Sequence, residues 1–236
     1  MAESGAQSVT VASYNIRKAV GADMRRRPSR ILDVLDEIGA DIVVVQEADR
    51  RFGTRAAAVA PAELQERGWR HVPVGMTPAA IGWHGNAILV SPRVEVESHD
   101  RLQLPVLEPR GAVLAGLRVG GRALRIVGMH LDLSGLWRRR QARAILDRLS
   151  DAGDTPTLLM GDMNEWRAAA GCLADFAATH KLVLTGPSFP ARTPIARLDR
   201  IFASNELEIE DGGVHQSPLS KVASDHLPLW VRVRLG

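Results

Sequence analysis

The chain has 236 residues, of which 45% are hydrophobic and 24% are charged, proportions that exclude a disordered, collagen-like or coiled-coil chain. This length supports one sizeable hydrophobic core, so we predict a single domain over residues 1–236, with residues 1–8 expected to be flexible. The net charge is only +3, and all but three of the 30 basic residues are arginine. Arginine suits a phosphate-bearing partner, but its abundance also follows from a GC-rich genome, so composition alone defines no function.

No apolar run approaches the roughly 20 residues that a membrane-spanning helix needs, and we expect no membrane insertion. The N-terminal segment lacks the basic-then-apolar order of a secretory signal. The single cysteine, Cys172, excludes an internal disulfide and a cysteine-rich zinc site. We therefore expect a cytoplasmic protein, and nothing in the sequence implies an obligate protein partner.

The first part of the chain predicts a strand, a helix and a second strand. Residues Val9–Asn15 alternate in hydropathy and are β-prone, which predicts a strand that ends at a polar residue. After a loop with the basic run Arg25–Arg27, a helix is predicted from Pro28 to Gly39, because its apolar residues recur at helical spacing. Asp41–Gln46 is a nearly continuous apolar run, typical of a strand that is covered on both faces.

The middle of the chain is rich in short strands, predicted over Asn86–Ser91, Val94–Ser98, Ala112–Val119 and Ala123–His130. Gly120 and Gly121 predict a tight hairpin turn between the last two. The remaining predictions are helices over Leu136–Leu149 and Arg167–Thr179 and strands over Thr157–Met160, Leu198–Ala203 and Leu229–Leu235. Because helices flank both strand-rich stretches, we predict an α/β fold, a four-layer α/β/β/α sandwich with two facing mixed sheets.

Polar residues interrupt these strands where each one ends. They are Asn15, Glu47, His130, Asp162 with Asn164, Asp199, and Asp225 with His226. Any one of them also has an ordinary explanation, because a polar residue at a strand end is often a surface group or the cap of a following helix. Ligand-binding and catalytic groups, however, gather at strand ends, and several buried carboxylates require a cation or mutual pairing.

Seven short motifs contain these residues, in order from position 13 to 228. They are Ser13-Tyr14-Asn15-Ile16, Gln46-Glu47, Arg110-Gly111-Ala112, His130-Leu131, Gly161-Asp162-Met163-Asn164, Leu198-Asp199-Arg200-Ile201 and Ser224-Asp225-His226-Leu227-Pro228. Each motif is weakly specific alone, but the ordered set resembles the endonuclease/exonuclease/phosphatase superfamily, which includes deoxyribonucleases, abasic-site endonucleases, inositol polyphosphate phosphatases and neutral sphingomyelinases. The resemblance implies a four-layer sandwich and hydrolysis of phosphate esters.

The resemblance also implies a divalent cation. Mg²⁺ suits this chemistry, because it accepts one or two carboxylates and keeps open positions for substrate, and Mn²⁺ is a possible substitute. Glu47 is the best candidate ligand, since its carboxylate follows a buried strand. The resemblance places Asn15 and Asp225 beside it as further ligands.

The predicted catalytic residues are His226, Asp199, Asp162, Asn164 and His130. His226 is the strongest candidate for handling a proton, because imidazole titrates near neutrality. By resemblance, Asp199 orients His226, while Asp162 and Asn164 position the attacking water and a phosphate oxygen. Family members differ in whether the aspartate or the histidine accepts the proton of the water, and both alternatives stay open at this point.

By resemblance, His130 donates a hydrogen bond to a phosphate oxygen or assists the leaving group. Some related nucleases pair this histidine with an earlier carboxylate, but the stretch from His71 to Val90 contains no Asp or Glu. Asp132 is a possible substitute partner, or it is structural. Arg110 resembles the phosphate-contacting arginine of the family, and the alternative is a surface arginine in a turn.

The function predicted first is a divalent-metal-dependent phosphodiesterase that hydrolyses nucleic acid, with DNA favoured over RNA, by in-line attack of water. The first alternative is a phosphatase or phospholipase-like hydrolase that acts on a small phosphorylated headgroup. The second is a non-catalytic binding module on the same scaffold, against which the intact set of acidic residues and histidine argues.

Overall fold

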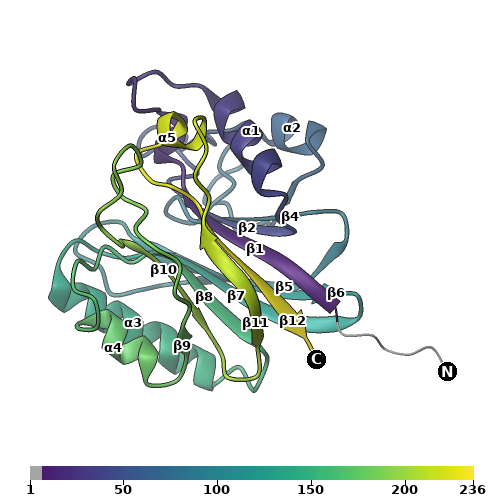
Figure 1. Cartoon of the computed structure of the whole chain (residues 1–236), viewed down its shortest axis with the longest axis vertical. Coiled ribbons are helices and arrows are strands. Elements are labelled where there is room, and N and C mark those ends of the chain that lie inside the picture. Colours follow the sequence, from purple (N-terminus) through teal and green to yellow (C-terminus); the bar gives the residue numbers. More distant parts are fainter. Residues whose placement is uncertain (1–6) are drawn as a thin grey trace.

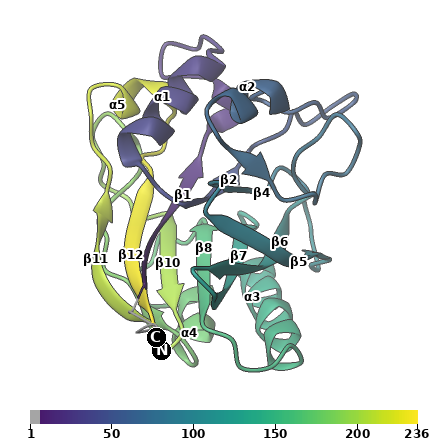
Figure 2. The same cartoon turned by 90° about the vertical axis from the view of Figure 1, so that its right-hand side faces the viewer.

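The computed structural model describes residues 7–236, so the predicted flexibility of residues 1–8 lies largely outside the described part of the chain. Two six-stranded sheets face one another (Figures 1 and 2). The first sheet has the order β11 (Glu208–Val214), β12 (Leu229–Leu235), β1 (Gln7–Asn15), β2 (Ile42–Gln46), β4 (Ala87–Val90) and β3 (Arg70–His71). The second has the order β5 (Val94–Leu102), β6 (Gly111–Val119), β7 (Arg122–His130), β8 (Thr157–Asp162), β10 (Asp199–Ala203) and β9 (Lys181–Leu182).

Helices cover the outer face of each sheet (Figure 2). Those over the first sheet are α1 (Pro28–Ile38), α2 (Pro61–Glu66) and α5 (Ser220–Ala223), with the 3₁₀ turn η1 (Arg17–Ala19) nearby. Those over the second sheet are α3 (Gly135–Ser150) and α4 (Cys172–Ala177). Three separate apolar clusters fill the spaces between the layers, one between the sheets and one under each helical layer. This confirms the predicted four-layer α/β/β/α sandwich with mixed sheets.

Each sheet contains one parallel pair of strands, and these two pairs determine where polar side chains gather. In the first sheet β1 runs parallel to β2, with Asn15 opposite Gln46. In the second sheet β7 runs parallel to β8, with His130 opposite Asp162. The antiparallel strand β10 adds Asp199 opposite Asp162. Parallel strands present their carboxyl ends at the same edge, so the motifs that follow β1, β2, β7 and β8 meet at one rim.

Gly161 allows β7 and β8 to reach this register. Its φ is +147°, and a Cβ atom at this position would lie 1.9 Å from the carbonyl oxygen of Met129. A side chain there would therefore push the two strands apart. The glycine of the Gly-Asp-Met-Asn motif thus brings Asp162 next to His130.

Most predicted elements are present, and the differences fall at polar or irregular segments. The helix predicted over Arg167–Thr179 is shorter and begins only at Cys172, because Gly171 has a left-handed φ of +64° that interrupts helical geometry. Strand β11 was not predicted, since its sequence, Glu-Ile-Glu-Asp-Gly-Gly-Val, is mostly polar. It forms an edge strand with a register shift between Ile209 and Asp211, which removes the regular alternation that identifies a strand.

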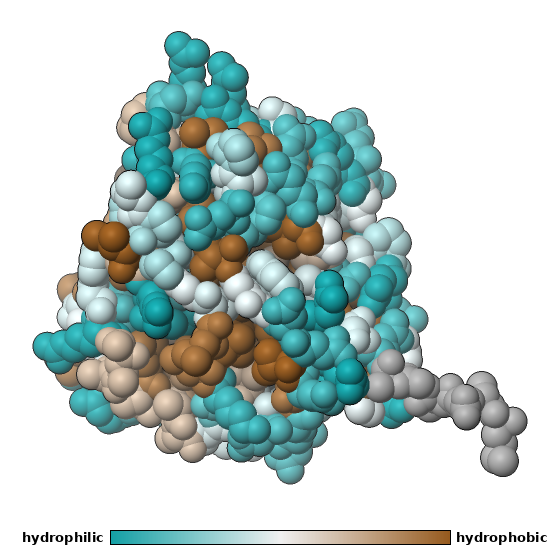
Figure 3. Space-filling view, viewed as in Figure 1, coloured by the Kyte–Doolittle hydropathy of each residue, from teal (hydrophilic) through white to brown (hydrophobic). Residues whose placement is uncertain are grey.

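The surface is mostly hydrophilic on the face that Figure 3 shows, with apolar areas between the polar ones. One apolar area lies over the edge strands β9 and β11 (Figure 3). Leu184 and Ile209 are exposed in these segments, and the chain next to β9 packs close to β11 at Gly212. Within residues 7–236, no helix combines the length and apolar character needed to cross a bilayer.

The two sheets approach closely where Gly128 of β7 faces Val44 of β2, because a Cβ atom at Gly128 would lie 2.5 Å from Val44 Cγ1. We predict that Gly128→Ala lowers the free energy of unfolding by about 1–3 kcal/mol through overpacking between the sheets. The measurement is urea denaturation followed by circular dichroism. Gly135→Ala is the control, since its Cβ meets nothing closer than 3.5 Å, and it should leave stability unchanged. Equal stability of the two variants would contradict this account of the packing.

Candidate active site

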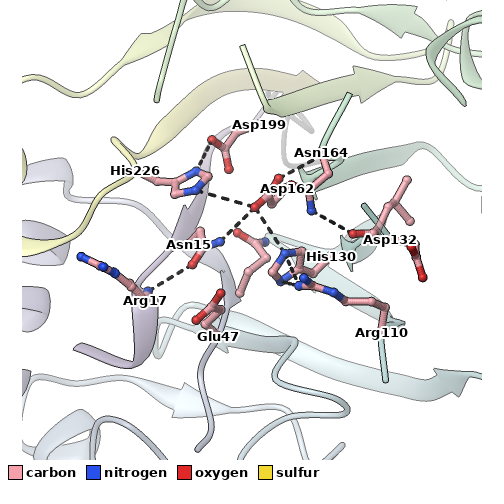
Figure 4. Close-up of polar contacts among 12 residues, drawn as sticks. Asn15, Arg17, Glu47, Arg110, His130, Asp132, Asp162, Asn164, Asp199 and His226 are labelled. Carbon is pink, nitrogen blue, oxygen red and sulfur yellow. Dashed lines mark hydrogen bonds and ion pairs between the residues drawn. The ribbon is translucent and has the colours of Figure 1, made fainter. Parts of the chain in front are cut away.

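The carboxylate of Asp162 lies at the centre of the polar cluster formed by the strand ends (Figure 4). Asp162 is only 2% exposed. Its Oδ2 accepts a hydrogen bond of 3.0 Å from Nδ2 of Asn15, across the space between the two sheets. The same oxygen lies 3.4 Å from Nε2 of His130 and 3.8 Å from Nε2 of His226. Four motifs that are far apart in the sequence therefore converge on one carboxylate.

His226 is held by Asp199. Its Nδ1 lies 2.8 Å from Oδ2 of Asp199, and the hydroxyl of Ser188 donates to the same oxygen. Burial by itself lowers the pKa of His226, but the carboxylates of Asp199, Asp162 and Asp225 outweigh burial and raise it to about 10. The ring is thus fixed in orientation, with Nε2 directed toward Asp162.

His130 has the opposite electrostatic character. Burial lowers its pKa to about 3, and Arg110 acts in the same direction against the opposing effect of Asp162. A guanidinium nitrogen of Arg110 lies 2.9 Å from Nδ1 of His130 and also contacts Nε2. His130 is therefore a neutral imidazole, and Arg110 is a site residue whose side chain is only 16% exposed, not a surface arginine.

Asp132 is not the partner of His130. Its Oδ1 accepts a hydrogen bond from the backbone N–H of Ser134 at 2.9 Å, and its Oδ2 accepts from the N–H groups of Leu107 and Glu108 at 3.3 Å each. Asp132 therefore tethers the loop before β6 to the end of β7. Its role is structural, and the contacts of His130 are with Arg110 and Asp162.

Asn164 completes the cluster on the β8 side. Its backbone N–H donates to Oδ1 of Asp162 at 3.0 Å, and its side-chain Nδ2 donates to the carbonyl of Leu131 at 2.9 Å. The backbone of Asn164 has a left-handed φ of +50°, which asparagine tolerates better than most residues. The loop after β8 is thereby folded back on its own aspartate.

Two of the three predicted metal ligands, Asn15 and Glu47, lie on the same side of Asp162 in Figure 4, and the third is Asp225. Oδ1 of Asn15 accepts from the backbone N–H of Arg17 at 3.1 Å, Glu47 is ion-paired with Lys18, and Asp225 is ion-paired with Nε of Arg17 at 3.2 Å. All three side chains offer oxygen, the ligand atom that hard divalent cations prefer. Both carboxylates already hold a positively charged partner, so these residues fit a cation site.

A second group of possible ligands is Asp162, Asp199 and His226, whose donor atoms all lie within 4.8 Å of one another. Oδ2 of Asp199 is occupied by Ser188 and by His226, and the position of His226 depends on that contact. This group is therefore organised as a hydrogen-bonded chain from Ser188 through Asp199 to His226, whose Nε2 lies 3.8 Å from Asp162. Glu47 and Asp225 remain the better candidates for the metal.

Several residues at the site were not identified from the sequence. Ser188 contacts Asp199, while Arg17 and Lys18 contact the predicted metal ligands. The sequence could have identified Lys18 as a site residue, because it is one of only three lysines and follows the Ser-Tyr-Asn-Ile motif by two positions. Ser188 lies 11 residues before Asp199 and has no pattern that connects the two.

A two-sheet sandwich with a buried cluster of Asp, Asn and His at one rim is the architecture of metal-dependent phosphoesterases. The chain belongs to the endonuclease/exonuclease/phosphatase family, whose model matches residues 12–226. The enzymes of this family hydrolyse phosphate esters and depend on a divalent metal. The matched region extends from β1 to His226 and includes every residue of the cluster.

Among known proteins, the chain is 26% identical over 251 aligned positions to the uncharacterised protein YbhP of Escherichia coli (strain K12), covering 97% of each. Its fold is similar to that of D. rerio TDP2 complexed with a single-strand DNA product, with a TM-score of 0.73, 16% identity and coverage of 96% and 99%. It is also similar to that of the mannosyl-6-phosphatase Bt3783 of Bacteroides thetaiotaomicron, with a TM-score of 0.73, 19% identity and coverage of 95% and 99%. At these identities the two structures demonstrate a shared fold.

A buried ion pair fixes the loop after β8. Nη2 of Arg138 lies 2.9 Å from Oε2 of Glu165, both side chains are less than a tenth exposed, and Nη1 of Arg138 donates to the carbonyl of Leu133. Glu165→Ala leaves the guanidinium buried without its carboxylate, so we predict a loss of about 3–5 kcal/mol in the free energy of unfolding.

Chemical denaturation measures this loss. The matched control is Glu208→Ala, which removes an exposed ion pair with Arg234 and should leave the unfolding midpoint nearly unchanged. If both variants unfolded at the wild-type midpoint, the ion pair between Arg138 and Glu165 would not stabilise the loop.

Proposed function

We propose that the protein is a divalent-metal-dependent phosphodiesterase that hydrolyses nucleic acid, with DNA favoured over RNA. The observation that carries this proposal is the convergence of Asn15, His130, His226 and Asn164 on the carboxylate of Asp162. Hydrolysis of a phosphate ester needs charge neutralisation, an oriented water and a route for protons. This cluster offers residues suited to each need.

In the proposed site, Glu47 would hold Mg²⁺ together with Asn15 and Asp225, and Mn²⁺ is a possible substitute. A cation bound there would supply charge neutralisation for the non-bridging phosphate oxygens. Lys18 and Arg17, which pair with Glu47 and Asp225, add positive charge beside the same site.

Asp162 and Asn164 orient the attacking water. Of the two residues that could accept its proton, Asp162 and His226, we favour Asp162, because a pKa of about 10 keeps His226 protonated at neutral pH, where Asp199 steadies the imidazolium. His130, as a neutral ring, donates one N–H to a phosphate oxygen or to the leaving oxygen, and Arg110 beside it adds positive charge. Asp199 and Ser188 act through His226 and are positioning residues.

The similarity to TDP2 bound to a DNA product favours a nucleic acid as substrate. The similarity to a mannosyl-6-phosphatase favours the alternative, a phosphatase or phospholipase-like hydrolase of a small phosphorylated headgroup.

An assay of turnover distinguishes these substrate classes. Its substrates are plasmid DNA, an RNA oligomer, bis-p-nitrophenyl phosphate and p-nitrophenyl phosphate. Turnover of the monoester alone would overturn the nuclease proposal, and turnover of none would favour a binding module. The cytoplasmic location remains a prediction.

Asp162→Asn and His226→Ala should each lower kcat on bis-p-nitrophenyl phosphate by at least about 100-fold, because each removes a group that orients the water or moves its proton. The measurement is steady-state release of p-nitrophenol with Mg²⁺. Asp147→Asn and His99→Ala change exposed residues away from the cluster and serve as matched controls. Circular dichroism shows whether the variants are folded. If a folded variant retained the wild-type rate, the role proposed for the substituted residue would be wrong.

EDTA should abolish turnover, and added Mg²⁺ should restore it. Mg²⁺ should also stabilise the fold by about 1.4 kcal/mol at ten times its dissociation constant, which appears as a rise in the thermal unfolding midpoint. Glu47→Gln should remove this rise, whereas Glu95→Gln, which changes an exposed carboxylate on β5, should retain it. A full rise in the Glu47→Gln variant would mean that Mg²⁺ binds elsewhere.

A further inference from the structure

A basic pocket adjoins the active site on the side of His130. Its positively charged lining consists of Lys18, Arg50, Arg51, Arg55 and Arg110, and we name it the arginine pocket. Two carboxylates, Glu47 and Asp49, also line it. Because Glu47, Arg110 and His130 belong to both the pocket and the catalytic cluster, a molecule bound at the cluster reaches the pocket directly.

The positive charges of this pocket are only partly compensated. Glu47 is paired with Lys18, and Glu108 lies 3.3 Å from Arg51 and 3.6 Å from Arg110. Both oxygens of Asp49 accept hydrogen bonds from backbone N–H groups, those of Ile81 at 3.0 Å and Gly82 at 2.9 Å. Within residues 7–236, neither Arg50 nor Arg55 forms a direct ion pair with a carboxylate, although the charge of Arg55 acts on Asp49 and partly opposes the rise in its pKa that burial causes.

The backbone around the pocket is held in a costly conformation. Left-handed φ angles occur at four lining residues other than glycine, namely Lys18 (+55°), Glu47 (+54°), Arg55 (+52°) and His84 (+47°). Each such residue costs free energy that the surrounding contacts must supply, and strain of this kind clusters at binding sites. Asp49 ties the loop that carries Arg50 and Arg55 to Ile81 and Gly82, and the backbone N–H of Arg50 donates to the carbonyl of Ala56, so the backbone that carries these arginines is fixed before a ligand arrives.

We infer that the arginine pocket binds a second phosphate group of the substrate, next to the phosphate that is hydrolysed. This rests on the proposed function, in which the cluster around Asp162 holds the scissile phosphate. Guanidinium groups without carboxylate partners are suited to phosphate oxygens, which they bind in a bidentate fashion. The second phosphate is either a terminal monoester or the neighbouring diester of a longer strand. The substrate class is therefore a phosphate ester that carries a second phosphate beside the scissile one.

The test measures binding without turnover, by isothermal titration calorimetry of the full chain in EDTA. The ligands are four thymidine oligonucleotides. The dinucleotide TpT has no terminal phosphate and therefore carries a single phosphate. The other three carry a second phosphate, which is terminal in pTpT and TpTp and internal in TpTpT. We expect at least one ligand with two phosphates to bind about tenfold or more tightly than TpT, and the preferred ligand identifies the source of the second phosphate. Equal affinity for all four overturns the inference.

The Arg50→Ala/Arg55→Ala variant should lose this preference and bind all four oligonucleotides with similar affinity. The matched control is Arg140→Ala/Arg232→Ala, which removes two exposed arginines from α3 and β12 and should keep the preference. Both substituted positions in the pocket are loop residues with no ion pair in the described chain, and an unchanged circular dichroism spectrum shows that the fold is intact. A preference that survives in Arg50→Ala/Arg55→Ala overturns the inference.

Turnover of bis-p-nitrophenyl phosphate, which has one phosphate, separates this inference from the proposed function. A wild-type protein that cleaves this diester with Mg²⁺ but binds all four oligonucleotides equally supports the proposed function and rejects the second phosphate site. A protein that shows the binding preference but cleaves no phosphate ester supports the site and rejects the proposed function.

Discussion

The proposed active site depends on one constraint, which is that the carboxylate of Asp162 is buried and must be compensated. Removing a charge from water is costly unless hydrogen bonds and opposite charges replace the lost hydration. Asn15, His130 and His226 supply these contacts, and each belongs to a different segment of the chain. The same contacts that make the buried carboxylate tolerable also give the two histidines opposite properties. His130 is kept neutral by burial and Arg110, while His226 is surrounded by acidic groups.

The fold brings these segments together because each sheet contains one parallel pair. The pair of β1 and β2 carries Asn15 and Glu47, and the pair of β7 and β8 carries His130 and Asp162. Both pairs end at the same rim of the sandwich, where Asn15 bridges the sheets to reach Asp162. Gly161 and Gly128 permit the close approach of strands and of sheets on which this arrangement depends.

Much of the fold and of the site was predictable from the sequence. The buried strands were recognisable from apolar runs such as Asp41–Gln46, and the motifs at their ends identified the residues that gather at Asp162. Strand β11 was not recognised, because an edge strand needs few apolar residues and its register shift breaks the alternation. Ser188 and Arg138 were missed for a different reason. Their roles depend on partners, Asp199 and Glu165, that only the tertiary structure brings into contact.

The proposed catalytic residues and the arginine pocket lie in different kinds of structure. The residues around Asp162 lie on strand ends that the sandwich holds rigidly, whereas Arg50 and Arg55 lie on a connecting loop between β2 and α2. Loops of this kind change length and sequence with little effect on a core. Replacing residues 50–60 of this connection, with Glu47 and Asp49 kept, therefore offers a direct route to redirect this scaffold to new esters, because the residues around Asp162 and the proposed metal ligands would be left intact.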